Sequence, residues 1–265
     1  MNLDVFIPTY NSEKYLRQCL ESVIRSIPVK RIILIDNYST DRTQKIAKEF
    51  GCELILDSRG LGKARELSFK LASTDVFATV ESDIVYEETG WFDRAISLLK
   101  GNVGAVVAYV QRPIEQNRGL FAYTLSRYTP LKEKRHGFSA GSTIWLKEAL
   151  KGIEIPSSLK AYEDLYIERM MRKRGWVYRW IEVKGKHYST LSDRKKAEWY
   201  GANARIFYSL TSDLSLLRRH ATIPFKATFA SLLSRDPKLI SWGISYTIAF
   251  MRGWAYPSRY YILKR

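Results

Sequence analysis

Cysteine is scarce in this sequence, with only Cys19 and Cys52 among 265 residues. The two are not spaced as a Cys-x-x-Cys pair, so the sequence offers no zinc-binding pattern. Cys19 lies on the apolar face of an expected helix, and Cys52 opens an expected strand. Small thiols in such positions usually pack in the core of a protein from a reducing compartment. The sequence therefore predicts a cytoplasmic location.

Long apolar segments are also few. The residues after Met1 enter an apolar strand directly, so we expect no secretory signal. Residues 239–256 are apolar around most of a helix, with Ser241, Ser245 and Arg252 as a narrow polar stripe. The stretch is slightly shorter than the roughly 20 residues that span a bilayer. Such a helix packs in a protein core, lies at a membrane interface or crosses it, and we expect the interfacial arrangement.

Acidic residues are scarce in the last third of the chain. Between Lys184 and Arg265 there are 15 Lys and Arg residues against 4 Asp and Glu residues, and the whole chain carries +16. This surplus suits an anionic partner, such as a phosphate group, an anionic membrane surface or a nucleic acid. A basic surface without a particular partner is the alternative. We expect residues 191–265 to form a basic, aromatic, helical region at the cytoplasmic membrane face.

Several nucleotide-binding and catalytic signatures are absent. Gly60-Leu-Gly62 is followed by Lys-Ala-Arg, so the third glycine of the G-x-G-x-x-G dinucleotide fingerprint is missing. The sequence also has no G-x-x-x-x-G-K-[ST] phosphate loop and no G-x-S-x-G nucleophile elbow. These absences disfavour a dinucleotide-binding enzyme, a P-loop nucleotide-binding protein and a hydrolase with a nucleophile elbow.

The sequence does contain a regular alternation of strand and helix patterns. Nearly continuous apolar runs such as 31–35 are typical of parallel strands covered on both faces. We expect strands over 3–8, 31–35, 52–56, 76–80, 103–110 and 177–183, and helices from about Ser12, after a cap at Ser39 or Thr40, and over 61–72, 91–100 and 162–173. Residues 112–140 show no clear period. This order predicts an α/β fold with a doubly wound, mostly parallel sheet.

Acidic residues lie where such a sheet binds its ligand, beyond the carboxyl ends of the strands. Asp36 ends one expected strand, and Glu81 and Asp83 follow another. Residues two apart in an extended segment point the same way, so Glu81 and Asp83 can face one ligand. Two adjacent carboxylates favour a shared cation, and their oxygens suit Mg²⁺ or Mn²⁺. A solvated turn at the strand end is the alternative.

Five short motifs follow one another along the chain. They are Phe6-Ile-Pro-Thr-Tyr-Asn11, Ile35-Asp-Asn-Tyr-Ser-Thr-Asp-Arg-Thr43, Gly60-Leu-Gly-Lys-Ala-Arg65, Glu81-Ser-Asp83, and Tyr162-Glu-Asp-Leu165 with Arg174-Gly-Trp176 behind it. This series resembles the family 2 glycosyltransferases of GT-A fold over roughly residues 3 to 190. The resemblance implies a catalytic domain over 1–190, with a nucleotide-binding half (1–110), an acceptor-binding half (111–190) and a helical extension (191–265).

The resemblance also implies roles for single residues. The donor-binding set comprises Pro8, Thr9 and Tyr10 at the base pocket, Asp36 on the nucleobase, Lys63 and Arg65 on the nucleotide, and Glu81 and Ser82 in the D-x-D motif. Asp83 would hold a divalent metal, with His187 as a further metal or phosphate contact. Asp164 would be the general base. Glu81 departs from the family pattern, because Glu replaces the usual first Asp of D-x-D and its reach is one methylene longer.

Each of these roles has a simpler alternative. Asp36 can cap a turn, Lys63 and Arg65 can lie on a helix surface, and His187 can be an ordinary polar residue after a strand. An acid at position 164, near a helix start, also interacts favourably with the helix dipole.

The implied activity is an inverting, metal-dependent transfer of a sugar from a nucleoside-diphosphate sugar to an acceptor, which we expect to be lipid-linked or part of an envelope glycan. The Gln-x-x-Arg-Trp motif of processive synthases is lacking, which favours single addition. A nucleotidyltransferase of related fold is one rival. A basic nucleic-acid-binding protein is another, although no nucleic-acid recognition motif is apparent and we expect no nucleic-acid partner.

Overall fold

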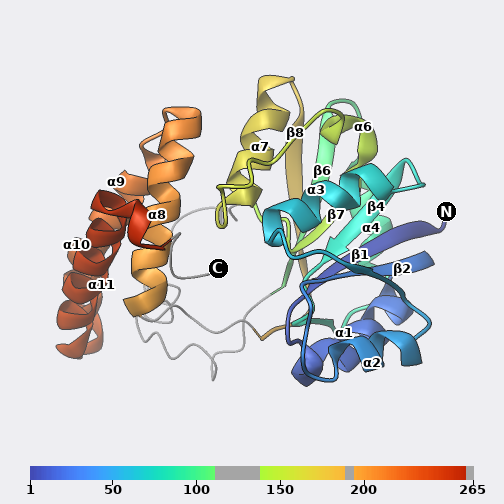
Figure 1. The fold of residues 1–265 in the computed structure, drawn as a ribbon, viewed down its shortest axis with the longest axis horizontal. Helices are drawn as coiled ribbons and strands as arrows, with labels where there is room; N and C mark the ends of the chain where they lie inside the picture. The colour runs from blue at the N-terminus through green and yellow to red at the C-terminus, as the bar shows by residue number, and fades with distance from the viewer. Residues whose placement is uncertain (111–137, 189–193, 261–265) are drawn as a thin grey trace. The chain divides into compact units, whose positions relative to one another are not determined.

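The computed structural model describes residues 1–110, 138–188 and 194–260. These residues form two compact units (Figure 1). The first unit contains 1–110 and 138–188, and the second contains 194–260. The stretch 112–140, which shows no clear period in the sequence, falls almost entirely outside the described residues.

A seven-stranded sheet forms the centre of the first unit. Its strands lie in the order β3-β2-β1-β4-β7-β6-β8, and all neighbours are parallel except β7, which is antiparallel to both β4 and β6. The strands are β1 (Leu3–Thr9), β2 (Val29–Asp36), β3 (Glu53–Leu56), β4 (Val76–Val80), β6 (Val103–Val110), β7 (Ser142–Leu146) and β8 (Val177–Val183). The expected α/β fold with a mostly parallel sheet is confirmed.

Helices cover both faces of this sheet (Figure 1). They are α1 (Glu13–Ser26), α2 (Thr43–Glu49), α3 (Leu61–Leu71), α4 (Trp91–Leu98), α6 (Lys147–Leu150) and α7 (Glu163–Lys173). Side chains alternate between the faces along each strand. Val5 therefore joins a core with α1, α2 and α4, whereas its neighbour Phe6 joins a second core with α3, α6 and α7. This double burial explains the continuous apolar runs in the sequence.

The structure differs from the sequence prediction in three local features. The second helix begins at Thr43 rather than at a Ser39 or Thr40 cap, because Asp41 accepts the Thr43 N–H (2.9 Å) and the Ser39 side chain turns to Asp36. The sequence pattern also missed β7 with α6. A small two-stranded sheet, β5 (Ile84–Tyr86) with β9 (Gly185–His187), was likewise not predicted.

The second unit is helical. It contains α8 (Arg194–Thr211), α9 (Ser215–Ala221), α10 (Ile223–Ser234), α11 (Lys238–Ala255) and the short 3₁₀ helix η2 (Pro257–Tyr260). Helices α8 and α11 pack closely at Gly253 of α11. A side chain there would not fit, because a Cβ on Gly253 would lie 1.8 Å from the Glu198 carbonyl oxygen of α8. Among the described helices, none combines the length and apolar character needed to cross a bilayer.

Candidate active site

The carboxyl ends of β1 and β2 are tied together by Asp36. This carboxylate is fully buried, and its Oδ1 accepts hydrogen bonds from the Thr9 hydroxyl (2.8 Å) and the Ser39 hydroxyl (2.5 Å). Its Oδ2 accepts from the Ser39 N–H (2.8 Å) and from Gln44 Nε2 (3.0 Å). Both carboxylate oxygens of Asp36 are thus hydrogen-bonded, each to two protein donors. These bonds fix the shape of the loop that follows β2.

Two exposed tyrosines lie in the loops that follow β1 and β2. Tyr10 follows β1 and is 63% exposed, and Tyr38 follows β2 and is 55% exposed. The two loops are joined, because Asn11 donates its N–H to the Ser39 hydroxyl (2.8 Å) and accepts the Thr40 N–H at Oδ1 (2.9 Å). Tyr38 holds a left-handed backbone with φ 54°, which is unfavourable for a bulky residue. The site therefore presents two aromatic rings on neighbouring, mutually braced loops.

The Glu81-Ser82-Asp83 segment forms a turn after β4. Ile84 donates its N–H to the Glu81 carbonyl (3.1 Å), so the segment is not extended as the sequence argument assumed. Glu81 and Asp83 nevertheless face the same group: His187 Nε2 lies 3.2 Å from Glu81 Oε2 and 3.5 Å from Asp83 Oδ1. The turn, rather than strand alternation, brings the two carboxylates together.

His187 reaches this turn through the small sheet. Ile84 of β5 pairs directly with His187 of β9, and Tyr188 donates its N–H to the Asp83 carbonyl (2.9 Å). One ligand atom from each of Glu81, Asp83 and His187 lies within 4.8 Å of the others. Two carboxylates and one imidazole form a donor set that suits Mn²⁺, and the partly buried position limits competition from water.

Arg65 approaches the same cluster from α3. Its side chain is 1% exposed, and Nη2 pairs with Glu81 Oε1 at 3.1 Å. Among the described residues, the buried Nε and Nη1 atoms of Arg65 have no hydrogen-bond partner. Unpaired buried donors are costly, so these two nitrogens beside the Glu81, Asp83 and His187 cluster are candidates to bind an anionic ligand.

Gly141 makes room for the longer side chain of Glu81. A Cβ added at Gly141 would lie 2.5 Å from both Cδ and Oε1 of Glu81, which is closer than real Cβ atoms approach. The backbones are also joined, since Glu81 donates its N–H to the Gly141 carbonyl (2.6 Å). The extra methylene of Glu81 is therefore accommodated over the bare backbone of Gly141, just before β7.

Gly141→Ala is expected to push the Glu81 carboxylate away from Arg65 and His187. We expect Mn²⁺-dependent nucleotide affinity to fall by roughly 10–100-fold, the usual effect of losing a group that orients metal ligands. Isothermal titration with UDP and GDP in the presence of Mn²⁺ measures this. The double variant Gly141→Ala with Glu81→Asp should recover most of the affinity, because the shorter acid vacates the occupied space. Equal affinity of Gly141→Ala and the unmodified chain would contradict this role.

Asp164 lies in the first turn of α7. It is half-buried, and its Oδ1 accepts the Leu165 N–H (2.8 Å). Its neighbour Glu163 is buried, and this burial raises the pKa of Glu163, with the negative charge of Asp164 adding to the rise and Arg65 opposing it. Glu163 therefore holds its proton more readily than an ordinary glutamate. Tyr162, just before the helix, has φ 63°, so the entry to α7 is a second strained backbone near the candidate site residues.

Other predicted site residues lie as follows. Pro8 is half-buried at the end of β1, and the Ser82 hydroxyl donates to the Ser12 hydroxyl (2.9 Å). Lys63 pairs with Glu66 at 2.7 Å. Within the described residues, the ion pair of Lys63 is therefore with Glu66 and not with the Glu81, Asp83 and His187 cluster. Sequence reasoning missed Gly141 and Tyr38. Tyr38 lies inside the motif Ile35–Thr43, and this place was a signal for it. Gly141 directly follows the stretch 112–140, which shows no clear period, so no pattern pointed to it.

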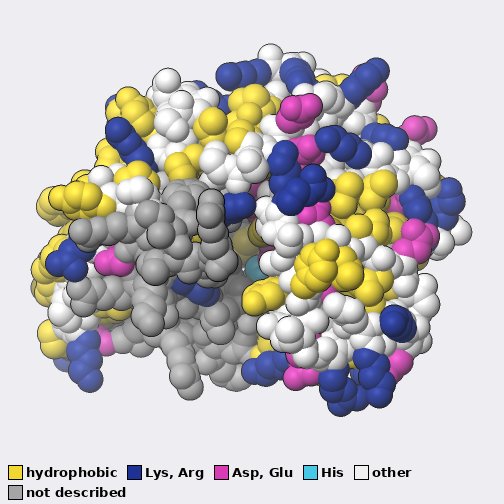
Figure 2. Space-filling model, viewed as in Figure 1, with side chains coloured by type: hydrophobic (Ala, Val, Ile, Leu, Met, Phe, Trp, Pro, Cys, Tyr) yellow, Lys and Arg dark blue, Asp and Glu magenta, His cyan; other side chains and the backbone are white. Residues whose placement is uncertain are grey.

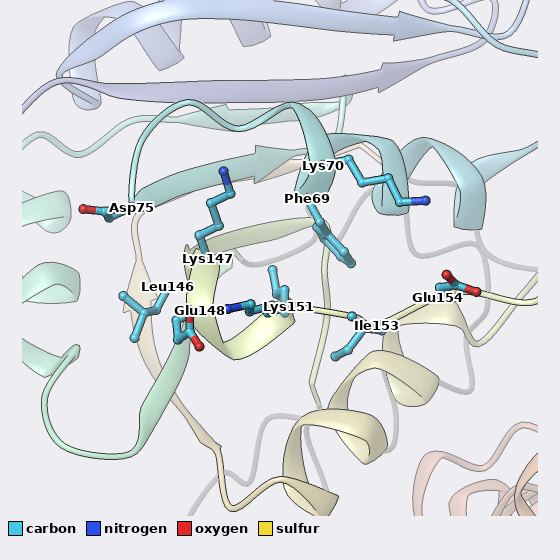
Figure 3. Close-up of a pocket in the computed structure, with 11 residues that line it drawn as sticks. Phe69, Lys70, Asp75, Leu146, Lys147, Glu148, Lys151, Ile153 and Glu154 are labelled. Atoms are coloured by element: carbon cyan, nitrogen blue, oxygen red, sulfur yellow. The ribbon is translucent and has the colours of Figure 1, made fainter.

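A pocket of about 670 Å³ lies at the amino end of β4, on the opposite side of the sheet's strands from the acidic cluster (Figure 3). It includes Asp75, just before β4, and Leu146, at the end of β7. Glu81 follows the opposite end of β4, so the pocket is separate from the acidic cluster. Two of its three lysines make structural contacts: Lys147 donates to the Ala72 carbonyl (2.6 Å), and Lys70 pairs with Glu66 (2.6 Å).

The first unit combines a mostly parallel α/β sheet with a cluster of two carboxylates and a histidine beyond the carboxyl ends of its strands. Comparisons with known proteins define its class. The model of "Glycosyl transferase family 2" matches residues 4–149. "Protein RfbJ" of Shigella flexneri is 27% identical over 117 residues, which are 44% of this chain and 91% of that protein. The poly(ribitol-phosphate) beta-N-acetylglucosaminyltransferase TarS of Staphylococcus aureus is 33% identical over 93 residues, which are 31% of this chain but only 16% of TarS.

Solved structures share the fold. The mannosyltransferase PcManGT of Pyrobaculum calidifontis, in complex with GDP-Man and Mn²⁺, has a TM-score of 0.65 and 16% identity, and the match covers 97% of this chain and 88% of that one. Glucosyl-3-phosphoglycerate synthase of Mycobacterium tuberculosis, in complex with Mn²⁺ and UDP-glucose, has a TM-score of 0.56 and 17% identity over 78% of each chain.

The chain belongs to glycosyl transferase family 2. It is a glycosyltransferase with a GT-A fold, as the motif series indicated.

Proposed function

We propose that the protein is an inverting, metal-dependent transferase that moves a sugar from a nucleoside-diphosphate sugar to an acceptor hydroxyl or phosphate. The observation that carries the proposal is the convergence of Glu81, Asp83 and His187 with Arg65 at the carboxyl ends of the strands. Mn²⁺-bound GT-A structures with sugar nucleotides support it, since they share this fold.

In this proposal Asp83 and His187 hold Mn²⁺ or Mg²⁺, and Glu81 orients Arg65 and His187 through its two oxygens. The cation, when bound, supplies a Lewis acid for the negative charge that develops on the leaving diphosphate. The free Nε and Nη1 donors of Arg65 add hydrogen bonds to the same phosphate oxygens. Arg65 is buried, so these donors act in a region of low dielectric, where they are strongest.

Asp164 is proposed as the general base. The acceptor hydroxyl attacks the anomeric carbon from the side opposite the diphosphate, and its proton passes to the Asp164 carboxylate. The bond from the sugar to the diphosphate breaks in the same step, so the configuration inverts and nucleoside diphosphate leaves. Burial raises the pKa of Glu163, so this neighbour holds its proton more readily than an ordinary glutamate, and the proposal assigns the base role to Asp164.

The nucleobase is proposed to lie against Pro8, Thr9 and Tyr10, with Tyr38 beside them. Asp36 already holds four protein donors, so its proposed contribution to base binding is to shape this loop. Exposed aromatic rings stack on a base regardless of its identity. The rings of Tyr10 and Tyr38 therefore explain affinity for a nucleoside without selecting uracil or guanine.

Tyr38→Gly separates a binding role from a structural one. Glycine relieves the left-handed backbone but is more flexible when unfolded, so the free energy of unfolding should stay unchanged or rise by up to about 1 kcal/mol. Nucleotide affinity should fall about 5–100-fold, as expected for losing one stacked ring. Thermal melting and titration with UDP and GDP give both numbers. Ser212→Gly, at another left-handed residue (φ 56°), is the control and should leave affinity unchanged. Unchanged affinity in Tyr38→Gly would remove Tyr38 from the site.

The acceptor is proposed to be lipid-linked or part of a cell-envelope glycan, met at the cytoplasmic face of the membrane. TarS acts on poly(ribitol-phosphate), by its name, and a second similar protein is the poly(ribitol-phosphate) beta-glucosyltransferase of Bacillus spizizenii. The two buried or half-buried free cysteines suit a reducing compartment. The basic last third of the chain suits an anionic membrane surface or a phosphate-bearing acceptor.

Product analysis tests the reaction type. Incubation with UDP- and GDP-sugars and Mn²⁺ should release the nucleoside diphosphate, whereas a nucleotidyltransferase would release pyrophosphate from a nucleoside triphosphate. Pyrophosphate as the product would refute the proposed transfer. Nucleic-acid binding that weakens steeply with salt, without any affinity for sugar nucleotides, would instead favour the nucleic-acid-binding alternative.

A further inference from the structure

Helix α10 exposes its large apolar side chains and buries its small ones. Phe225, Phe229 and Leu232 are 78%, 57% and 74% exposed, and their spacing of four and three residues places them on one stripe. The buried side of the helix carries Ala227 and Ala230 instead. A helix that is stabilised by packing on its own protein normally shows the reverse distribution.

The packing of α10 fixes this orientation. Ala227 and Ala230 form a small core with Leu239, and Ile223 and Trp242 pack against it. Gly243 of α11 lies so close that a Cβ there would be 2.4 Å from the Ala227 Cβ. Turning the helix to bury its phenylalanines would force large rings into a space sized for alanine and glycine. The stripe therefore stays outward.

Basic residues accompany the stripe, and acidic residues are nearly absent. From Leu214 to Tyr260 the single acidic residue is Asp236. The basic residues of this segment are Arg218, Arg219, Lys226, Arg235, Lys238, Arg252 and Arg259. The first five of these are exposed and lie in α9, in α10, at the end of α10 or at the start of α11. Figure 2 shows hydrophobic side chains gathered over α10 and α11, with Lys and Arg side chains among them.

We infer that the face of α10 formed by Phe225, Phe229 and Leu232, the α10 stripe, docks on the surface of an anionic lipid bilayer. Exposed aromatic and leucine side chains on one helix face insert at the boundary between headgroups and acyl chains. Lys and Arg beside them contact the negative headgroups. A partner protein with an apolar groove would satisfy the stripe but gives no reason for seven basic residues against one acid. The inference goes beyond the proposed transfer and does not depend on it, because lipid binding needs no donor.

Vesicle co-sedimentation of the full chain, without nucleotide, tests the inference. Vesicles of phosphatidylglycerol with phosphatidylcholine should bring the protein down, vesicles of phosphatidylcholine alone should bind much less, and added salt should weaken the binding. The triple variant Phe225→Ser, Phe229→Ser, Leu232→Ser should lose roughly tenfold or more in partitioning. These side chains are exposed, so circular dichroism should show an unchanged fold.

The control is Ile24→Ser with Leu71→Ser, two exposed apolar residues of the first unit (52% and 38%). It should bind vesicles as the unmodified chain does. Failure of the unmodified chain to bind anionic vesicles, or full binding by the triple variant, would overturn the inference. Sedimentation without vesicles that the triple variant abolishes would also overturn it, since the stripe would then be a contact between copies of the chain. None of these outcomes bears on the proposed transfer, which product analysis tests separately.

Discussion

Asp164→Asn is expected to lower kcat by about 10²–10⁴-fold, the range that general-base catalysis contributes. The amide is nearly isosteric with the acid, and it can still accept the Leu165 N–H that Asp164 accepts now. It cannot take the acceptor proton. Because Asp164 is proposed to act on the acceptor and not on the donor, Mn²⁺-dependent nucleotide affinity should be unchanged. Steady-state kinetics with the active sugar nucleotide and titration with its nucleoside diphosphate provide the two readouts.

Glu168→Gln is the matched control for this variant. Glu168 lies one turn further along α7 and pairs with Arg172 at 2.7 Å, so its loss affects the helix surface and not the proposed chemistry. Its kcat should stay close to that of the unmodified enzyme. Full turnover in Asp164→Asn would assign the base elsewhere. A parallel loss of nucleotide affinity would mean that Asp164 serves the donor site.

Asp83→Ala is expected to remove Mn²⁺-dependent binding of nucleoside diphosphates. Residues that merely orient metal ligands usually contribute roughly 10–100-fold to metal affinity, so a ligand itself should contribute more. Glu81 and His187 would remain, 3.2 Å apart, but His187 would be the single proposed ligand left, and Glu81 would still only orient it. Titration of Mn²⁺ in the presence of UDP or GDP, followed by the paramagnetic signal of free Mn²⁺, measures the loss directly.

The control variant for Asp83→Ala is Asp93→Ala, which removes an exposed carboxylate from α4. It should leave Mn²⁺ binding unchanged. Retention of Mn²⁺ binding by Asp83→Ala would show that this aspartate is not a ligand. His187→Ala should weaken Mn²⁺ binding as well, and the extent of its effect reports whether the imidazole is a ligand or only a neighbour of the carboxylates.

The fold was predictable because its central strands are buried on both faces. Continuous apolar runs at 31–35 and 103–110 matched β2 and β6, and the strand-end position of Asp36 and Glu81 followed from them. The antiparallel strand β7 was not predictable in the same way. It follows a stretch without periodicity, and only its pairing with β4 and β6 makes Ser142–Leu146 a strand.

The candidate site depends on contacts between residues that are distant in sequence. Sequence spacing paired Glu81 with Asp83, but only the pairing of β5 with β9 brings His187 to them. Gly141 meets Glu81 because Val80 pairs with Ser142 across β4 and β7. Asp36 shows a different limit: the sequence indicates a carboxylate at a strand end, but not that four neighbouring donors occupy its oxygens.

The exposed stripe of α10 was also hidden from the sequence argument. The apolar pattern of 239–256 attracted attention because it is long, and it forms α11. The shorter α10 is distinguished by which of its residues are buried. That distribution depends on the close contact of Ala227 with Gly243, which no periodicity reveals.

The central claim is that the carboxyl ends of β1, β2 and β4 form a metal-dependent nucleotide site. Thermal unfolding of the unmodified chain tests this claim most directly, with a panel of nucleoside diphosphates in the presence and absence of Mn²⁺. A ligand present at about 100 times its Kd stabilises a folded protein by about 2.7 kcal/mol. For a chain of this size that corresponds to a rise in Tm of roughly 5–10 °C. The account predicts such a rise for at least one nucleoside diphosphate, and only when Mn²⁺ is present. No rise with any nucleotide, in the presence or absence of Mn²⁺, would contradict it.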